Sequence, residues 1–166
     1  MNHLQEKIKK IKLVLLDVDG TMTDGGIYIL PDGTQLKRFF AQDGEGIRRA
    51  IEAGFEVGII SAAGLAKDII MQRAKILNIT RVHAERSSKV EVAKKWATEL
   101  NLLPEEVAYM GDDVIDAEVM QWCGLACAPK LAHKSALAVA DYVTEKEAGY
   151  GAVREFMDMI METNTL

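Results

Sequence analysis

The segment DVDGT places two carboxylates, Asp17 and Asp19, directly after a short apolar run. Carboxylates at this spacing can converge on one cation and one reacting group. One of them can then act as a nucleophile while the other transfers protons. Because Asp and Gly also favour ordinary turns after strands, this segment alone leaves a purely structural interpretation open.

A second acidic cluster, GDDVID, follows the apolar run VAYM and contributes Asp112, Asp113 and Asp116. The glycine that opens it allows close approach of the backbone. Clustered carboxylates without nearby histidine or cysteine suit a hard cation such as Mg²⁺, which would offset their mutual repulsion. Two unrelated acidic turns do not explain why both clusters follow predicted strands.

Two further positions could bind an anion. Ser61 directly follows the apolar run 55–60, so its hydroxyl and the backbone N–H of Ala62 would face a helix entrance, an arrangement that binds phosphate. Lys89 opens a predicted helix and could neutralise an anionic substrate. Each also has an ordinary explanation, since serine often caps helices and lysine is usually solvated.

The alternation of apolar runs and amphipathic segments predicts the elements that position these residues. The pattern favours an α/β fold, a Rossmann-like doubly wound parallel sheet with helices on both faces. The Asp-Gly turn within residues 26–40 predicts a β-hairpin flap, and no cap domain fits elsewhere. We expect one domain over residues 1–166. Predicted strands cover 12–17, 80–84, 107–110, 125–128 and 142–143 besides 55–60, and predicted helices cover 44–53, 65–77, 89–100, 115–122, 134–139 and 152–162.

Composition narrows the class of protein. A net charge of −5 does not favour nucleic-acid or anionic-membrane partners, which prefer basic surfaces. The sequence contains no apolar run of about 18 residues and no secretory pattern, so we expect a cytoplasmic location. Cys123 and Cys127 form a weak metal signal, and we expect two buried thiols.

Four features together resemble the motif set of the haloacid dehalogenase superfamily. In chain order they are DVDGT, the hydroxyl after the second buried strand, the lysine and GDDxxD. The resemblance implies that Asp17 forms an aspartyl-phosphate and that Asp19 is the general acid and base. It also implies phosphate binding by Ser61, Ala62 and Lys89. The implied Mg²⁺ ligands are Asp17, the Asp19 backbone carbonyl and Asp112, with Asp113 and Asp116 supporting the metal shell and the lysine.

The absence of a cap makes the chain similar to the capless branch of this superfamily. The segments TDGGIYILPDGTQLKRFF and AGYGAVRE resemble the 3-deoxy-D-manno-octulosonate 8-phosphate (KDO 8-phosphate) phosphatases. This implies a phosphorylated 2-keto-3-deoxy sugar acid as substrate and a homotetramer with its hairpins packed centrally. It also implies that Thr23, Asp24 and Gly25 line the flap side and that residues 149–154 help to close the pocket.

One departure concerns the sugar. Where that family usually has I-[TS]-G-R, with an arginine for the substrate carboxylate, this chain has Ile60-Ser61-Ala62-Ala63-Gly64. Alanine cannot replace a bidentate arginine. A second candidate substrate is therefore a sialic-type nine-carbon keto acid 9-phosphate, because that related phosphatase also lacks the arginine. A catalytically idle scaffold of the same fold and a phosphomutase also stay open, although a capless site exposes its substrate to water, which disfavours the mutase.

Overall fold

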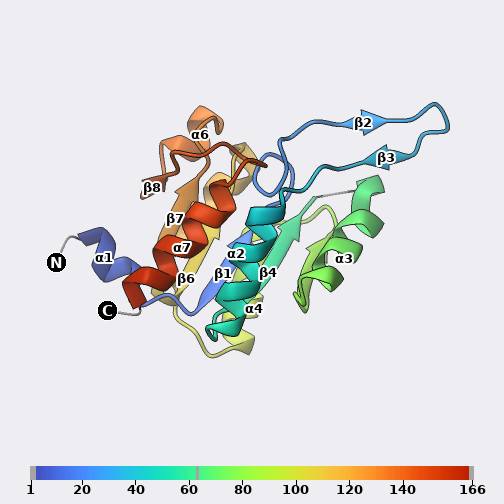
Figure 1. Cartoon of the computed structure of the whole chain (residues 1–166). Coiled ribbons are helices and arrows are strands. Elements are labelled where there is room, and N and C mark those ends of the chain that lie inside the picture. The colour runs from blue at the N-terminus through green and yellow to red at the C-terminus, as the bar shows by residue number, and fades with distance from the viewer. Residues whose placement is uncertain (1–2, 63, 165–166) are drawn as a thin grey trace.

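The centre of the molecule is a six-stranded parallel sheet, seen in the computed structural model, which describes residues 3–62 and 64–164. Figure 1 shows the strands side by side with helices around them. The order across the sheet is β5-β4-β1-β6-β7-β8. The strands are β1 (Leu13–Leu16), β4 (Glu56–Ser61), β5 (Arg81–Ala84), β6 (Val107–Met110), β7 (Leu125–Ala128) and β8 (Tyr142–Val143).

The strand order reverses direction between β1 and β6, which are neighbours in the sheet although they lie far apart in sequence. Leu16 pairs with Met110, so the loops after both strands leave the sheet at the same point. In doubly wound sheets, ligands bind in the crevice beyond the carboxyl ends of the strands at this switch point. The two acidic clusters therefore share the expected position of a binding site.

Both faces of the sheet are covered, which explains why its central strands are continuous apolar runs. In β1, Val14 and Leu16 belong to the core on one face, while Leu13 and Leu15 belong to the core on the other. The first face packs against α1 (His3–Ile8), α2 (Ala41–Glu52), α3 (Lys67–Ile76) and α7 (Ala152–Asn164), and the second against α4 (Lys89–Glu99), α5 (Ala117–Trp122) and α6 (Lys134–Leu137). The predicted doubly wound fold is confirmed.

Residues 26–40 form the expected hairpin, which projects from the body of the molecule (Figure 1). Its strands, β2 (Tyr28–Ile29) and β3 (Gln35–Leu36), pair antiparallel in a sheet of their own. Gly33 in the turn has φ +84°, a conformation that side-chain-bearing residues rarely adopt. At the base, Thr23 and Phe39 form an isolated antiparallel bridge that ties the hairpin to the loop after β1.

Helix α2 begins at Ala41, earlier than the predicted start at Gly44. Glycine inside a helix costs about 1 kcal/mol relative to alanine, and close packing explains two such glycines here. A Cβ on Gly44 would lie 2.4 Å from the Arg73 guanidinium, and one on Gly46 would lie 2.9 Å from the Arg154 side chain. The glycines thus allow α2 to approach α3 and α7.

Other boundaries differ modestly from the prediction. The strands at 107–110, 125–128 and 142–143 are found as predicted, whereas α1 was not predicted. Three predicted loops or helix starts contain short 3-10 turns, η1 (Gly64–Ala66), η2 (Pro104–Glu106) and η3 (Val114–Asp116). Helix α6 ends at Leu137, short of the predicted 139. Cys127 is buried as expected, Cys123 is only partly buried, and both are free thiols.

Candidate active site

Asp17 lies directly after β1 and is buried at the switch point. The following loop is tight, because the backbone N–H groups of Thr21, Met22 and Thr23 all donate to the Val18 carbonyl at 2.9–3.2 Å. Gly20 completes this loop with φ +78°, and a Cβ there would lie 2.1 Å from a carboxylate oxygen of Asp112. The loop after β1 and the loop after β6 are therefore in direct contact.

Asp116 is the most deeply buried carboxylate of the second cluster. Its Oδ2 accepts hydrogen bonds from the backbone N–H groups of Asp112 and Asp113, both at 3.0 Å. Its Oδ1 accepts from the Tyr109 hydroxyl at 2.6 Å and from Lys89 at 2.7 Å. Four donors thus fix this carboxylate, which organises the loop around it.

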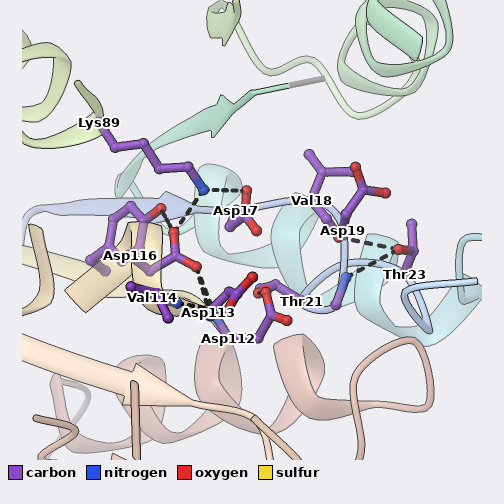
Figure 2. Close-up of polar contacts among 12 residues, drawn as sticks. Asp17, Val18, Asp19, Thr21, Thr23, Lys89, Asp112, Asp113, Val114 and Asp116 are labelled. Carbon is purple, nitrogen blue, oxygen red and sulfur yellow. Dashed lines mark hydrogen bonds and ion pairs between the residues drawn. The ribbon is translucent and has the colours of Figure 1, made fainter. Parts of the chain in front are cut away.

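Lys89 connects the two clusters (Figure 2). It is the first residue of α4, it is buried, and its ammonium donates to Asp17 Oδ1 at 2.6 Å as well as to Asp116. A cation at a helix N-terminus opposes the helix dipole. Burial alone would lower the pKa of Lys89, but the charges and hydrogen bonds of Asp17 and Asp116 outweigh it and raise that pKa. The lysine therefore stays charged.

The carboxylates of Asp17, Asp112 and Asp116 each place an oxygen within 4.8 Å of the others. Burial raises the pKa of Asp17 to about 8, against the opposing charge of Lys89. Burial, with the charges of Asp116 and Asp113, raises the pKa of Asp112 to about 6. Both shifts indicate a deficit of positive charge, and an all-oxygen cluster of this kind fits a hard divalent cation. Asp17 and Asp112 could hold such an ion, since both oxygens of Asp116 are already hydrogen-bonded.

The remaining site residues of the sequence prediction lie around this centre. Ser61 is the last residue of β4 and is buried, and Ala62 is half-buried. In the register of β4 with the neighbouring β1, Ser61 lies one residue further along the strand direction than Asp17. Ala63 lies outside the described residues. Asp113 is exposed, and its Oδ1 accepts from the backbone N–H of Val114 at 2.7 Å, so it caps the η3 turn. Among the described residues, the hydrogen bonds of the Lys89 ammonium go to Asp17 and Asp116 and not to Asp113.

The flap side of the site is built on Thr23, whose buried hydroxyl donates to the Val18 carbonyl and accepts from the backbone N–H of Gly25 at 3.3 Å. Asp24 and Gly25 line a cavity of about 200 Å³ together with Gly20 and Asp112. Glu147, Ala148 and Tyr150 of the same chain also line it. A Cβ on Gly149 would lie 2.5 Å from the Asp24 backbone nitrogen, so this segment packs directly on the flap loop.

Two residues of the site were not identified from the sequence. Tyr109 lies within β6 and resembles an ordinary core residue, although its hydroxyl contacts Asp116. Lys37 follows β3 in the hairpin and forms an ion pair with Asp19. Nothing in the local sequence singles out this lysine, because only the folding back of the hairpin brings it to Asp19.

Comparison with known proteins agrees with this geometry. The profile of haloacid dehalogenase-like hydrolases matches residues 63–157. The 3-deoxy-D-manno-octulosonate 8-phosphate phosphatase of Salmonella typhi is 40% identical over 159 residues, which cover 96% of this chain and 84% of that protein. The chain belongs to the haloacid dehalogenase-like hydrolase family. The corresponding phosphatase of Escherichia coli K12 is 41% identical to this hydrolase over 155 residues, 93% and 81% of the two chains.

Solved structures resemble this haloacid dehalogenase-like hydrolase over almost its whole length. The 3-deoxy-D-manno-octulosonate 8-phosphate phosphatase from Moraxella catarrhalis, in complex with magnesium, phosphate and KDO, has a TM-score of 0.95 at 32% identity and covers 99% of this chain and 94% of its own. The cobalt-bound phosphatase from Haemophilus influenzae has a TM-score of 0.90 at 30% identity and covers 96% and 92%. Among the described residues of the hydrolase, no helix is long and apolar enough to cross a membrane.

Proposed function

We propose that this chain is a Mg²⁺-dependent phosphatase that hydrolyses a phosphorylated 2-keto-3-deoxy sugar acid, with KDO 8-phosphate as its substrate. The observation that carries the proposal is the convergence of Asp17, Lys89, Asp112 and Asp116 at the switch point of the sheet. The choice of KDO 8-phosphate is supported by the relatives at 40–41% identity, which are phosphatases of that compound. An idle scaffold is disfavoured, because buried charges are costly and this chain retains all of them.

In the first step, one carboxylate oxygen of Asp17 attacks phosphorus and the bond to the sugar oxygen breaks. Asp19 gives its proton to that departing oxygen. Lys89 donates to Asp17 Oδ1, so it orients the nucleophile and offsets negative charge as the phosphate arrives. Ser61 and the backbone N–H of Ala62 supply further donors to the phosphoryl oxygens.

In the second step, Asp19 takes a proton from water, which attacks the aspartyl-phosphate and releases inorganic phosphate with regeneration of Asp17. Asp17, the backbone carbonyl of Asp19 and Asp112 would hold Mg²⁺, supported by the loop that Asp116 and Asp113 organise. When bound, this cation offsets the charge of the carboxylates and of the phosphoryl group.

Asp17 is the proposed nucleophile. Asp17→Asn should lower phosphate release by at least about 1,000-fold, because an amide cannot form the covalent intermediate. Phosphate release is measured with a colorimetric assay, and circular dichroism checks that the variant folds. Glu99→Gln makes the same chemical change at the far end of α4, where Glu99 pairs with Arg81, and should keep full activity. An Asp17→Asn enzyme with more than a tenth of the activity contradicts the assignment, and activity that survives EDTA removes the metal from the mechanism.

The substrate is tested by a screen of KDO 8-phosphate, nine-carbon keto acid 9-phosphates and simple sugar phosphates. Ala62-Ala63 stands where the KDO 8-phosphate phosphatase family usually has glycine and the carboxylate-binding arginine, which keeps the nine-carbon acid as a second candidate. Preference for KDO 8-phosphate in kcat/KM supports the proposal, and preference for the nine-carbon ester selects the second candidate. Equal, slow turnover of all esters contradicts a keto-acid substrate altogether.

The proposed enzyme is a homotetramer in which the hairpins of the subunits pack together. Support comes from the exposed apolar side chains of the hairpin, with Ile27 and Ile29 at 72% and 64% exposure. A lone two-stranded hairpin is marginally stable in water, and an exposed apolar surface of this kind marks an interface.

A further inference from the structure

The Lys37 side chain is almost fully covered, although the apolar side chains of the hairpin strands around it are exposed. It follows β3 on the returning arm, and its ammonium forms an ion pair with Asp19 Oδ1. The Lys37 side chain is only 7% exposed, whereas the Asp19 side chain is 44% exposed. The flanking hairpin residue Leu36 is half exposed. A solvated surface lysine would not be buried in this way, since removing an ammonium from water is costly unless it is paired.

The two carboxylates of DVDGT are thus held by two different lysines. Lys89 from α4 holds Asp17, and Lys37 from the hairpin holds Asp19. Asp17 is also confined by burial, but Asp19 lies in the more open part of the loop and has no such confinement. A partly exposed aspartate samples several rotamers, so the ion pair with Lys37 restricts the direction in which this carboxylate points.

We propose that Lys37 is a positioning residue for proton transfer, holding the Asp19 carboxylate in the orientation that reaches the departing oxygen. This inference rests on the proposed function, in which Asp19 is the general acid and base. It also links the hairpin to the chemistry, because the Thr23–Phe39 bridge and the Lys37–Asp19 pair both tie the returning arm of the hairpin to the loop after β1.

Lys37 could have two other roles, and each predicts kinetics that differ from those of the positioning role. Lys37 also lines a cavity of about 450 Å³ with residues of α3, including Ile69 and Gln72, from which it could contact the sugar. It could equally serve only to hold the hairpin in place. Its ammonium pairs with Asp19 and not with the acid in that cavity lining, Asp68, among the described residues, which favours the positioning role.

The test compares leaving groups in Lys37→Met. The parameter kcat/KM covers the steps up to release of the alcohol, so it isolates the acid role of Asp19. An alkoxide needs a proton as it departs, whereas nitrophenolate needs little help. Lys37→Met should therefore lower kcat/KM about 10- to 100-fold for KDO 8-phosphate and for glycerol 3-phosphate. The loss should be at most about threefold for p-nitrophenyl phosphate, and Lys37→Arg should recover much of the alkyl-ester activity.

Control variants complete the design. Lys94→Met removes an exposed lysine paired with Glu91 on α4 and should change none of these values. In the Asp19→Asn background, Lys37→Met should cost no more than about twofold further, because the two residues act as a unit. Lys37→Gln provides the same comparison if the methionine variant melts below the assay temperature.

The pattern of activity losses over the three esters distinguishes the possible roles of Lys37. Equal losses for all three esters mean that Lys37 only holds the hairpin, and a loss confined to KDO 8-phosphate means that it contacts the sugar. Either result overturns the positioning role and leaves the phosphatase function intact. Absence of activity in the unaltered enzyme on every ester would instead refute the proposed function itself.

Discussion

At the scale of single residues, the site is a set of carboxylates whose charge is only partly balanced. Lys89 satisfies one oxygen of Asp17 and one of Asp116, and Tyr109 adds a neutral donor. Asp112 receives no comparable side-chain cation among the described residues. Burial is the main cause of the raised pKa values of Asp17 and Asp112, the neighbouring carboxylates add to it, and a bound cation would oppose both shifts.

The affinity for Mg²⁺ should depend on pH because of these shifts. Protons and the metal compete for Asp17 and Asp112, whose pKa values are about 8 and about 6 in the metal-free protein. Affinity should therefore rise by up to roughly tenfold per pH unit between about pH 6 and 8, and level off above that. Isothermal titration calorimetry between pH 5.5 and 8.5 measures this, with Asp112→Asn expected to bind more weakly and with a shallower slope. A constant affinity over this range contradicts the proton–metal competition.

The raised pKa values of Asp17 and Asp112 also make the stability of the folded protein depend on pH. A carboxyl whose folded pKa lies above its unfolded value stabilises the folded state below the unfolded pKa, and this contribution is lost as pH rises through the folded pKa. The metal-free protein should thus lose stability from about pH 4 to about pH 8, and added Mg²⁺ should raise the melting temperature more at pH 8 than at pH 6.

At the scale of elements, the helices that carry no catalytic residue still determine the shape of the site. Asp43 in the first turn of α2 is buried, and its Oδ1 accepts from the backbone N–H of Arg154 at 2.8 Å. Asp43 therefore caps the N-terminus of α7 from a neighbouring helix. Because α7 continues from the segment that packs on Asp24, this cap also holds the wall of the cavity beside Asp112.

Asp43→Ala should lower the free energy of unfolding by about 1–2 kcal/mol, the usual cost of losing a helix cap. Asp43→Asn keeps an acceptor and should cost less. Urea denaturation followed by circular dichroism gives these values. Asp68→Ala removes an exposed aspartate from the first turn of α3 and should cost no more than about 0.5 kcal/mol. Equal losses in the two alanine variants would show that Asp43 does not act as a cap for α7.

At the scale of the whole molecule, the hairpin exposes a group of apolar side chains that lie close together in the sequence. Its apolar side chains Ile27, Tyr28, Ile29, Leu30 and Leu36 are all exposed, and Figure 1 shows it extending away from the sheet. The hairpin also carries Lys37 at its base, so association of hairpins would steady the residue that contacts Asp19.

The double substitution Ile27→Lys and Ile29→Lys should prevent assembly. Like charges would then meet at an interface from which water must be removed. Size-exclusion chromatography with light scattering should give a tetramer for the unaltered chain and a smaller species for the double variant. Leu103→Lys changes an exposed leucine on the body of the molecule and should leave the tetramer intact. An unaltered chain that is monomeric at all concentrations contradicts the proposed assembly.

The sheet, the hairpin and the positions of the acidic clusters could be predicted from local sequence pattern. Buried parallel strands are continuous apolar runs, and Asp17 and Asp112 each follow such a run, so their meeting at one edge could be predicted from local pattern alone. Helix starts were harder to predict, because the glycines of α2 are explained by contacts with Arg73 and Arg154 and not by intrinsic propensity.

The partner of each carboxylate could not be predicted from the sequence and depends on the folded arrangement. Lys37 and Tyr109 look ordinary in sequence, and Asp113 looks equivalent to Asp116, yet Asp116 binds Lys89 while Asp113 caps a turn. The physical reason is that side-chain pairing depends on distance and burial between segments far apart in sequence. Apolar periodicity records which face of an element is buried, but it does not record which charges that burial brings together.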